Sequence, residues 1–380
     1  MTNYTLHERF VAARPKRILA LDGGGIRGAL TLGYLEHVEK LLQQRHQNPS
    51  LRLCDYFDLI GGTSTGSIIA GGLAIGMSVA EIKQRYSELG ATIFGKTRLL
   101  HLFRQAKFDH AALEKGLQNT FGDICLGDDT LKTGICIFAK RVDTQSLWTL
   151  NNNPNFPYYD YDKKIKLWEA IRASAAAPTY FEPIDLEALS DGEELTVRGI
   201  FTDGGISPAN NPALHLLMMT QVSKYGFNWK GTSDDLLVVS VGTGRSEIKY
   251  DKKKVSDWTT LNWASTIPNM MMADASDYNE IIMQLLSQSP TRRHYDSVMK
   301  DLSGELLGRT PLCTYLRYNF LMSASNFKDL GGLYANLDED EIEDLTDFTK
   351  GKNVNQLYEI GKIVGEKEVN ATHFPFVFDV

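Results

Sequence analysis

The sequence has few of the features that mark disulfide-stabilised or metal-binding proteins. Its 380 residues include only four cysteines, none in a CxxC pair: Cys54, Cys125, Cys136 and Cys313. Disulfide frameworks and zinc sites depend on such spacings, so the sequence argues against both and fits a reducing cytoplasm. No cluster of histidines, cysteines and carboxylates has the spacing of metal ligands, so we expect no metal and no other cofactor.

Long apolar runs and an excess of positive charge are also missing. No stretch approaches 18 apolar residues, and the polar N-terminus lacks the apolar segment of a signal peptide. We therefore expect a cytoplasmic protein whose contact with a membrane, if any, is peripheral. The net charge of −7 argues against a nucleic acid polymer as partner, because general nucleic-acid binders are usually basic.

Short apolar runs that end in glycine alternate with helical patterns along the chain. "ILALD" at 18–22 is followed by a glycine-rich loop and then by leucines at helical spacing. "YFDLIGG", "VRGIFTDGG" and "DLLVVSVGTG" are further apolar runs that end in glycine. Continuous apolar strands of this kind are typical of parallel sheets that are covered on both faces. The sequence thus predicts an α/β fold with a mostly parallel central sheet flanked by helices.

Four later segments complete the expected secondary structure. "TGICIFAKRVD" and "SLWTLNN" are predicted to pair as a β-hairpin near the edge of the sheet. "IPNMMMADASDYNEIIMQLLSQ" is predicted to form one long amphipathic helix, and "TYLRYNFLM" one late strand.

Ser64 lies between two glycines at a predicted junction of strand and helix, in Gly62-Thr63-Ser64-Thr65-Gly66. A nucleophile elbow needs this context, since its serine adopts a strained turn that leaves room only for small neighbours. Gly62 and Gly66 supply that room, and the dipole of the next helix favours developing negative charge. The alternative is an ordinary tight turn, but the context favours a nucleophile.

The loop "DGGGIRG" offers unencumbered backbone N–H groups at Gly23, Gly24 and Gly25, which suits an oxyanion hole. The same letters match the G-x-G-x-x-G pattern of dinucleotide-binding folds. That alternative lacks the expected acidic residue at the end of the second strand. For Arg27 we expect a structural role in positioning the loop.

A nucleophilic serine also needs a base. His215, His294 and His373 follow in the order of a hydrolase triad, but none lies beside a turn glycine. Asp203, in contrast, ends a predicted strand and precedes Gly204 and Gly205. A carboxylate bonded to the serine could accept its proton if burial raised its pKa. A loop or capping role for Asp203 is the alternative.

Four segments, "LALDGGGIRG", "GTSTG", "ASAAAPTYFEP" and "TDGGISPANNP", resemble in order the four blocks of the patatin-like phospholipases. The resemblance extends from about Lys16 to Asp347. It implies a single domain at 16–375 with a helical C-terminal region, after an N-terminal extension at 1–15. It also implies a Ser64–Asp203 dyad with Gly23, Gly24 and Gly25 as the oxyanion hole, supported by Arg27, Gly62, Gly66, Gly204 and Gly205.

The activity that this resemblance implies is metal-independent hydrolysis of lipid acyl esters, including those of membrane phospholipids, through an acyl-enzyme. Some compact bacterial members look like anti-phage signalling effectors that a cyclic nucleotide activates, although nothing in this sequence shows such a switch. The sequence also leaves open whether the protein forms a homo-oligomer. The alternatives are an esterase of soluble substrates with a histidine triad, and a nucleotide-binding module that uses the glycine-rich loop.

Two groups of residues bear on the substrate. Five methionines could line an acyl channel or touch a bilayer, although core packing is the more frequent role: Met218, Met219, Met270, Met271 and Met272. Four lysines could attract anionic headgroups, although a solvated loop is the more frequent role: Lys249, Lys252, Lys253 and Lys254.

Overall fold

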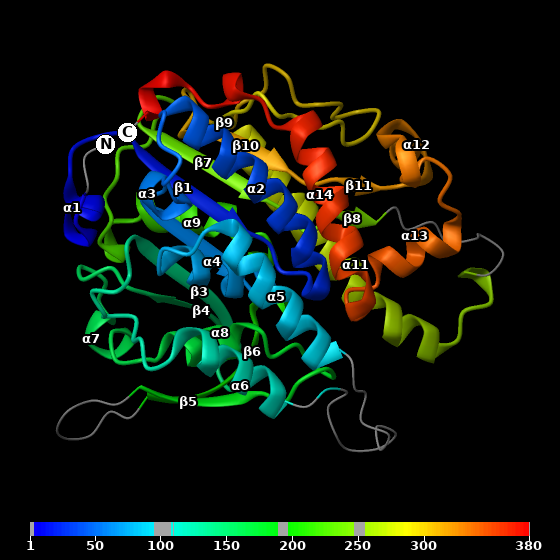
Figure 1. Ribbon diagram of the computed structural model, residues 1–380, viewed down its shortest axis with the longest axis horizontal. Helices are drawn as coiled ribbons and strands as arrows, with labels where there is room; N and C mark the ends of the chain where they lie inside the picture. Colours follow the sequence, from blue (N-terminus) through cyan, green and yellow to red (C-terminus); the bar gives the residue numbers. More distant parts are fainter. Residues whose placement is uncertain (1–3, 95–107, 109, 189–196, 247–254, 380) are drawn as a thin grey trace.

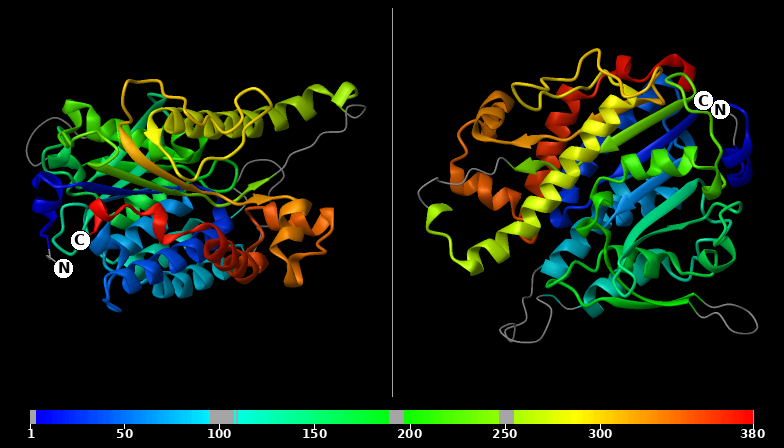
Figure 2. Two further views of the ribbon diagram at one scale, coloured as in Figure 1. Left: turned by 90° about the horizontal axis from the view of Figure 1, so that it is seen from above. Right: turned by 180° about the vertical axis from the view of Figure 1, so that it is seen from behind.

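A central sheet lies between two layers of helices in the computed structural model (Figures 1 and 2). The model describes residues 4–94, 108, 110–188, 197–246 and 255–379. Six strands are parallel, in the order β3-β2-β1-β7-β10-β9. Their bounds are β1 Lys16–Leu21, β2 Leu59–Thr63, β3 Gly134–Arg141, β7 Leu236–Val241, β9 Ser287–Gln288 and β10 Cys313–Tyr318. This confirms the predicted α/β class.

Helices cover both faces of the sheet. One face carries α2 (Gly28–Arg45), α4 (Thr65–Ala74), α5 (Val79–Phe94), α6 (His110–Phe121), α8 (Leu167–Ser174) and α14 (Val354–Glu368). The other carries α9 (Ala213–Gln221) and α11 (Thr260–Leu285). The shorter elements are α1 Leu6–Val11, α3 Leu53–Tyr56, α7 Tyr159–Asp162, α12 Ala324–Leu330, α13 Glu339–Thr346, β8 Arg245–Ser246 and β11 Leu321–Met322.

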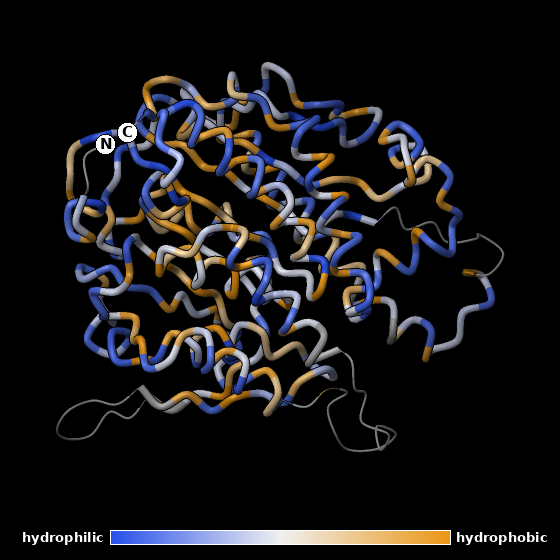
Figure 3. The backbone as a smooth tube through the Cα atoms, viewed as in Figure 1, coloured by the Kyte–Doolittle hydropathy of each residue, from blue (hydrophilic) through white to orange (hydrophobic). Residues whose placement is uncertain are grey.

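The apolar run of β1 explains why the sheet needs both layers. Leu19 and Leu21 pack with the first group of helices, and Ile18 and Ala20 pack with α9, because successive side chains of a strand point to opposite faces. All four are fully buried. In Figure 3 the strands at the centre of the molecule are largely hydrophobic, whereas many segments at its periphery are hydrophilic.

Strand β3 brings together the ends of β2 and β6 (Val197–Asp203). Residues 134–138 of β3 pair with β2 in parallel, and residues 139–141 pair with β6 in antiparallel. The hairpin strand β4 (Ser146–Asn151) pairs with residues 136–141 and so occupies the opposite side of β3. Strands β2 and β6 therefore lie end to end on one side of β3. Thr63 is opposite Phe138, and Asp203 is opposite Ala139.

Other predictions are confirmed in part. The β3–β4 hairpin forms as expected, and β6 pairs with β5 (Ile184–Ala188) outside the parallel region. The predicted late strand is two strands, because β10 ends at Tyr318 and β11 joins β8 in a separate two-stranded sheet. Helix α11 begins seven residues before the predicted start at Ile267, although Pro268 lies inside it.

The N-terminal segment packs against the sheet. Phe10 is buried in the core on the α9 side, and its carbonyl accepts a hydrogen bond from the Trp229 indole. The boundary between an extension at 1–15 and a domain at 16–375 stays a prediction. No helix within the described ranges is long and apolar enough to cross a membrane. The expected cytoplasmic location also stays a prediction.

Candidate active site

Ser64 occupies a sharp turn between β2 and α4. Its φ of 53° and ψ of −122° are strained for a residue with a side chain. The two flanking glycines are sterically required. A Cβ at Gly62 would lie 2.2 Å from the Gly66 carbonyl oxygen, and one at Gly66 would lie 2.2 Å from the Leu21 carbonyl oxygen. Ser64 itself is half-buried, so its hydroxyl lies at the start of α4 within reach of solvent.

Asp203 is the hydrogen-bond partner of the Ser64 hydroxyl. Ser64 Oγ donates to Asp203 Oδ2 at 2.6 Å, and the Gly205 N–H donates to Asp203 Oδ1 at 2.6 Å. Asp203 is 4% exposed. Burial raises the pKa of Asp203 to about 6, against the opposing effect of these two hydrogen bonds. A carboxylate with this pKa is ionised at neutral pH and is a better base than a free aspartate.

The turn that follows Asp203 is also tightly packed. Residues Gly204–Ile206 form the 3-10 helix η2. A Cβ at Gly204 would lie 2.4 Å from the Phe138 carbonyl oxygen, and one at Gly205 would lie 2.9 Å from Asp203 Oδ1. Both glycines therefore let the chain turn beside the carboxylate.

Ser174, at the end of α8, holds the Ser64 backbone. The Ser64 N–H donates to Ser174 Oγ at 2.8 Å, and Ser174 Oγ donates to the Phe138 carbonyl at 2.6 Å. Ser174 is fully buried. The sequence prediction missed this residue, although it lies in the "ASAAAPTYFEP" segment. Its small side chain at a helix end was the only signal.

The glycine-rich loop lies against Ser64. A Cβ at Gly23 would lie 3.2 Å from the Ser64 Cβ. The Gly23 N–H, however, already donates to the Asn210 carbonyl at 3.1 Å. The N–H groups of Gly24 and Gly25 have no acceptor within the described residues. This differs from the sequence prediction, in which Gly23 is one of three donors to the oxyanion.

Two contacts fix this loop, one from strand β10 and one from the turn that follows β7. The Arg317 guanidinium on β10 donates to both carboxylate oxygens of Asp22, at 2.8 and 2.6 Å, and both side chains are buried. The Thr243 hydroxyl donates to the Gly23 carbonyl at 3.1 Å. Because Asp22 directly precedes Gly23, the bidentate ion pair holds the start of the loop in one orientation.

Arg27 ends the short 3-10 helix η1 (Gly25–Arg27). It is half-buried, and burial lowers its pKa although Asp22 and Asp347 oppose this effect. Its Nε has no hydrogen-bond partner among the described residues. Among the described residues, Arg27 forms no hydrogen bond with Ser64 or Asp203. Its role in positioning the loop stays a prediction.

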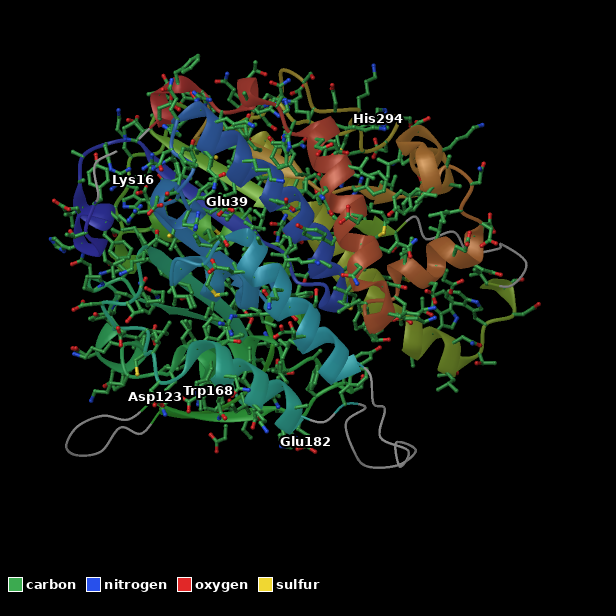
Figure 4. All side chains as sticks on the ribbon, viewed as in Figure 1. Lys16, Glu39, Asp123, Trp168, Glu182 and His294 are labelled. Atoms are coloured by element: carbon green, nitrogen blue, oxygen red, sulfur yellow. The ribbon has the colours of Figure 1, made fainter. Side chains whose placement is uncertain are left out.

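The three late histidines make their contacts elsewhere. His215 packs edge-on against Phe138, and burial lowers its pKa to about 4. His373 Nδ1 pairs with the Tyr318 hydroxyl at 3.0 Å. His294 lies in the segment between β9 and β10, at the periphery of the molecule (Figure 4). Within the described chain none of them bonds to Ser64 or Asp203.

The substrate-side residues divide into four groups, one of which is the half-buried Met270. Met219 is fully buried and belongs to the core, as the more frequent role predicts. Met218, Met271 and Met272 are exposed, so core packing does not explain them. The four lysines at 249–254 lie outside the described residues. The four cysteines are unpaired, and no group of His, Cys, Asp and Glu in the described chain is arranged to hold a metal.

An α/β fold with a serine at a strained strand-to-helix turn is typical of serine hydrolases. The family model described as patatin-like phospholipase matches residues 19–217, which is more than half of the chain. The chain therefore belongs to the patatin-like phospholipase family. This confirms the resemblance in the sequence and the prediction of an enzyme that hydrolyses lipid ester bonds.

Three curated relatives illustrate the similarity. Patatin-17 of Solanum cardiophyllum is 29% identical over 68% of this chain and 69% of its own length. The cGAMP-activated phospholipases of Escherichia coli and Vibrio cholerae are 31% and 30% identical over 60% of this chain. The alignments cover 62% and 64% of these two bacterial proteins, so the chain spans less than two thirds of the length of each.

Proposed function

We propose that this protein is a phospholipase that cleaves acyl esters with a Ser64–Asp203 dyad. The observation that carries the proposal is the 2.6 Å hydrogen bond from Ser64 Oγ to a buried carboxylate. Burial raises the pKa of Asp203 to about 6, which makes it a stronger base while leaving it ionised at neutral pH. Family membership supports lipid esters as the substrate class.

The dyad performs both halves of the reaction. Asp203 takes the proton from Ser64 Oγ as that oxygen attacks the ester carbonyl. The negative charge that develops on the carbonyl oxygen is stabilised by the N–H groups of Gly24 and Gly25 and by the N-terminus of α4. The tetrahedral intermediate collapses, the carbonyl-to-alkoxy bond breaks, and Asp203 returns the proton to the leaving alcohol.

Water completes the cycle by the reverse sequence. It attacks the acyl-enzyme while Asp203 accepts its proton, and the bond to Ser64 Oγ breaks as Asp203 returns that proton to the serine. The free fatty acid leaves, and the dyad is restored.

The test is lipid analysis of mixed liposomes incubated with purified protein, alongside Ser64→Ala. Wild-type protein should release free fatty acid and lysophospholipid, and Ser64→Ala should lose about 10⁶-fold in turnover while circular dichroism shows an unchanged fold. More than a few per cent of the wild-type rate in Ser64→Ala would remove the serine from the mechanism. A thermal shift with dinucleotides, with no ester cleavage by either protein, would favour the nucleotide-binding alternative.

Activation by a cyclic nucleotide, in an anti-phage signalling effector, is a second part of the proposal. It is supported by the two bacterial relatives that are named cGAMP-activated phospholipases. Purified protein assayed on liposomes with and without cGAMP tests it, with AMP as control. Stimulation by cGAMP alone is the expected result. Equal rates in all three samples would contradict it.

A further inference from the structure

Helix α11 consists of two halves with opposite environments. Its C-terminal half is buried, with Asn279, Glu280, Met283 and Gln284 all less than 8% exposed. Its N-terminal half extends past the body on the side to which the carboxyl ends of β1 and β7 point (Figures 1 and 2). Most of the described side chains of this half are exposed to solvent, and several of these are large and apolar.

The exposed apolar side chains of this half follow the helical repeat. Trp263, Ile267 and Met271 are four residues apart and share one face, with exposed fractions of 40%, 45% and 66%. Leu261 and Met272, three turns apart, extend the apolar surface on the neighbouring side. We call these five residues the α11 apolar surface. Trp258 packs edge-on against Trp263, with ring centroids 4.8 Å apart, beside this surface.

Charge is missing from the same segment. From Trp258 to Ala273 the chain has no Asp, Glu, Lys or Arg, whereas 23% of the whole chain is charged. The polar residues among the described side chains here are neutral, such as Asn262 and Thr266. A helix surrounded by water usually carries charged residues. The uncharged composition therefore indicates that one side of this segment contacts an apolar partner.

The C-terminal half connects this surface to the proposed catalytic loops. The Asn279 amide donates to the Pro208 and Asn211 carbonyls, in the segment that follows Asp203. Glu280 accepts a hydrogen bond from Arg317, the arginine that holds Asp22 before the glycine-rich loop. One continuous helix thus joins the apolar surface to both sides of the site.

We propose that the N-terminal half of α11 inserts its apolar surface into the interface of a lipid bilayer. This inference rests on the proposed function, because a phospholipase must reach a substrate that is embedded in such a surface. A bilayer fits the broad apolar surface and the tryptophans, which favour the boundary between water and acyl chains. Because the segment is uncharged, the apolar contact drives binding and anionic lipid is not required.

The first measurement is flotation with phosphatidylcholine vesicles. The catalytically silent Ser64→Ala protein is used, so that the lipid stays intact. Ile267→Asn/Met271→Asn in this background should reduce the bound fraction by about tenfold or more, since two apolar side chains no longer enter the bilayer. The matched control is Val298→Asn/Leu333→Asn, which removes two apolar side chains that are 87% and 92% exposed elsewhere. The control should bind like its parent.

Salt separates this mode of binding from charge attraction. Binding to phosphatidylcholine should change less than twofold between 50 and 500 mM salt, values chosen to span more than twofold in Debye length. Binding that requires anionic lipid and disappears at high salt would overturn the proposal. So would equal binding of the α11 double variant and the control.

Two activity assays separate this proposal from the dyad. With native Ser64, the α11 double variant should hydrolyse a water-soluble short-chain ester at the wild-type rate but lose most of its rate on vesicles. If wild type cleaves neither substrate with or without cGAMP, the proposed function fails. If the α11 double variant cleaves both substrates at the wild-type rate, the membrane-binding proposal is contradicted and the dyad is not. The other possible partner of this surface is a second copy of the chain, which sedimentation analysis tests. If the wild type is a dimer that the α11 double variant dissociates and the control does not, and vesicle binding is unchanged, the surface is a dimer interface and the membrane proposal is overturned.

Discussion

The side chain of Ser174 fixes the backbone of Ser64 to the central sheet. Its hydroxyl accepts the Ser64 N–H at 2.8 Å and donates to the Phe138 carbonyl at 2.6 Å. The strained turn therefore has an anchor on β3, the strand that also aligns β2 and β6. A residue without any chemical step of its own thus controls where the proposed nucleophile lies.

Ser174→Ala tests this anchor. It leaves a buried N–H and a buried carbonyl without their partner, so we expect a loss of ~1–3 kcal/mol in the free energy of unfolding. We also expect kcat on a soluble ester to fall by about tenfold with little change in KM, because Ser64 loses its orientation. Thr133→Ala is the control, since Thr133 makes a similar buried bond to the Phe57 carbonyl. It should lose stability but keep kcat. An unchanged kcat in Ser174→Ala would remove the positioning role.

The identity of the base is tested by four variants on one ester. Asp203→Asn keeps the shape of the side chain but removes its basicity, so turnover should fall on the order of 10³-fold or more. Alanine variants of His215, His294 and His373 should keep most of the activity, because none of these residues bonds to Ser64. An active Asp203→Asn beside one inactive histidine variant would replace the dyad by a triad.

The loss of activity at low pH should reflect protonation of Asp203. With a pKa of about 6, its carboxylate becomes protonated as the pH falls below this value and can no longer accept the serine proton. We expect kcat/KM on a short-chain ester to fall about tenfold per pH unit below pH 6. The profile is measured only where circular dichroism shows intact protein. If the activity instead falls with a midpoint near pH 7, and one histidine variant removes this fall, the assignment to Asp203 is contradicted.

The same pKa predicts that Asp203→Asn stabilises the fold. Burial raises the pKa from its ordinary value of 3.8 to about 6, so the folded protein holds the proton more tightly than the unfolded chain. Ionised Asp203 therefore costs stability above pH 6, by about 3 kcal/mol, and this cost disappears as the pH falls towards 3.8. We expect a higher Tm for Asp203→Asn at pH 7.5 and a smaller difference at pH 4.5. Equal melting temperatures at pH 7.5 would contradict the raised pKa.

Removal of metal ions should leave the activity unchanged. The mechanism proposed for Ser64 and Asp203 uses no metal, and the sequence contains no cluster with ligand spacing. Ester hydrolysis in EDTA should match the rate without it. A large loss that calcium restores would reveal a metal requirement. Ser64→Ala, assayed in parallel, gives the background rate.

Much of the fold could be predicted because its signals are local. Each apolar run that ends in glycine forms the end of a strand, and the parallel strands β1, β2 and β7 end at the same edge of the sheet. The fourth, β6, arrives from the opposite direction and meets β2 on β3. The sequence of β6 does not indicate that it pairs in antiparallel, because the pattern of apolar residues in a strand is the same in both directions.

The positions of Ser64 and Asp203 could be predicted, but their supporting contacts could not. The residues that hold the site are Ser174, Asn210 and Arg317, and each bonds to a partner more than 100 residues away. The occupied N–H of Gly23 belongs to this group, because only the folded chain brings the Asn210 carbonyl to it. A glycine-rich segment indicates free donors, but tertiary structure decides which of them stay free.

The end-to-end meeting of β2 and β6 has a consequence for how the chain tolerates insertions. The two strands share no ladder with each other, so the separation of Ser64 and Asp203 depends on the register of both strands on β3. One residue added between Phe138 and Ala139 would lengthen this spacing by ~3.3 Å and reverse the faces of the side chains beyond it. The 2.6 Å contact of the dyad would be lost. Length changes in the connections between these strands leave that register intact, so relatives can differ there in length and still keep the same pair of side chains in contact.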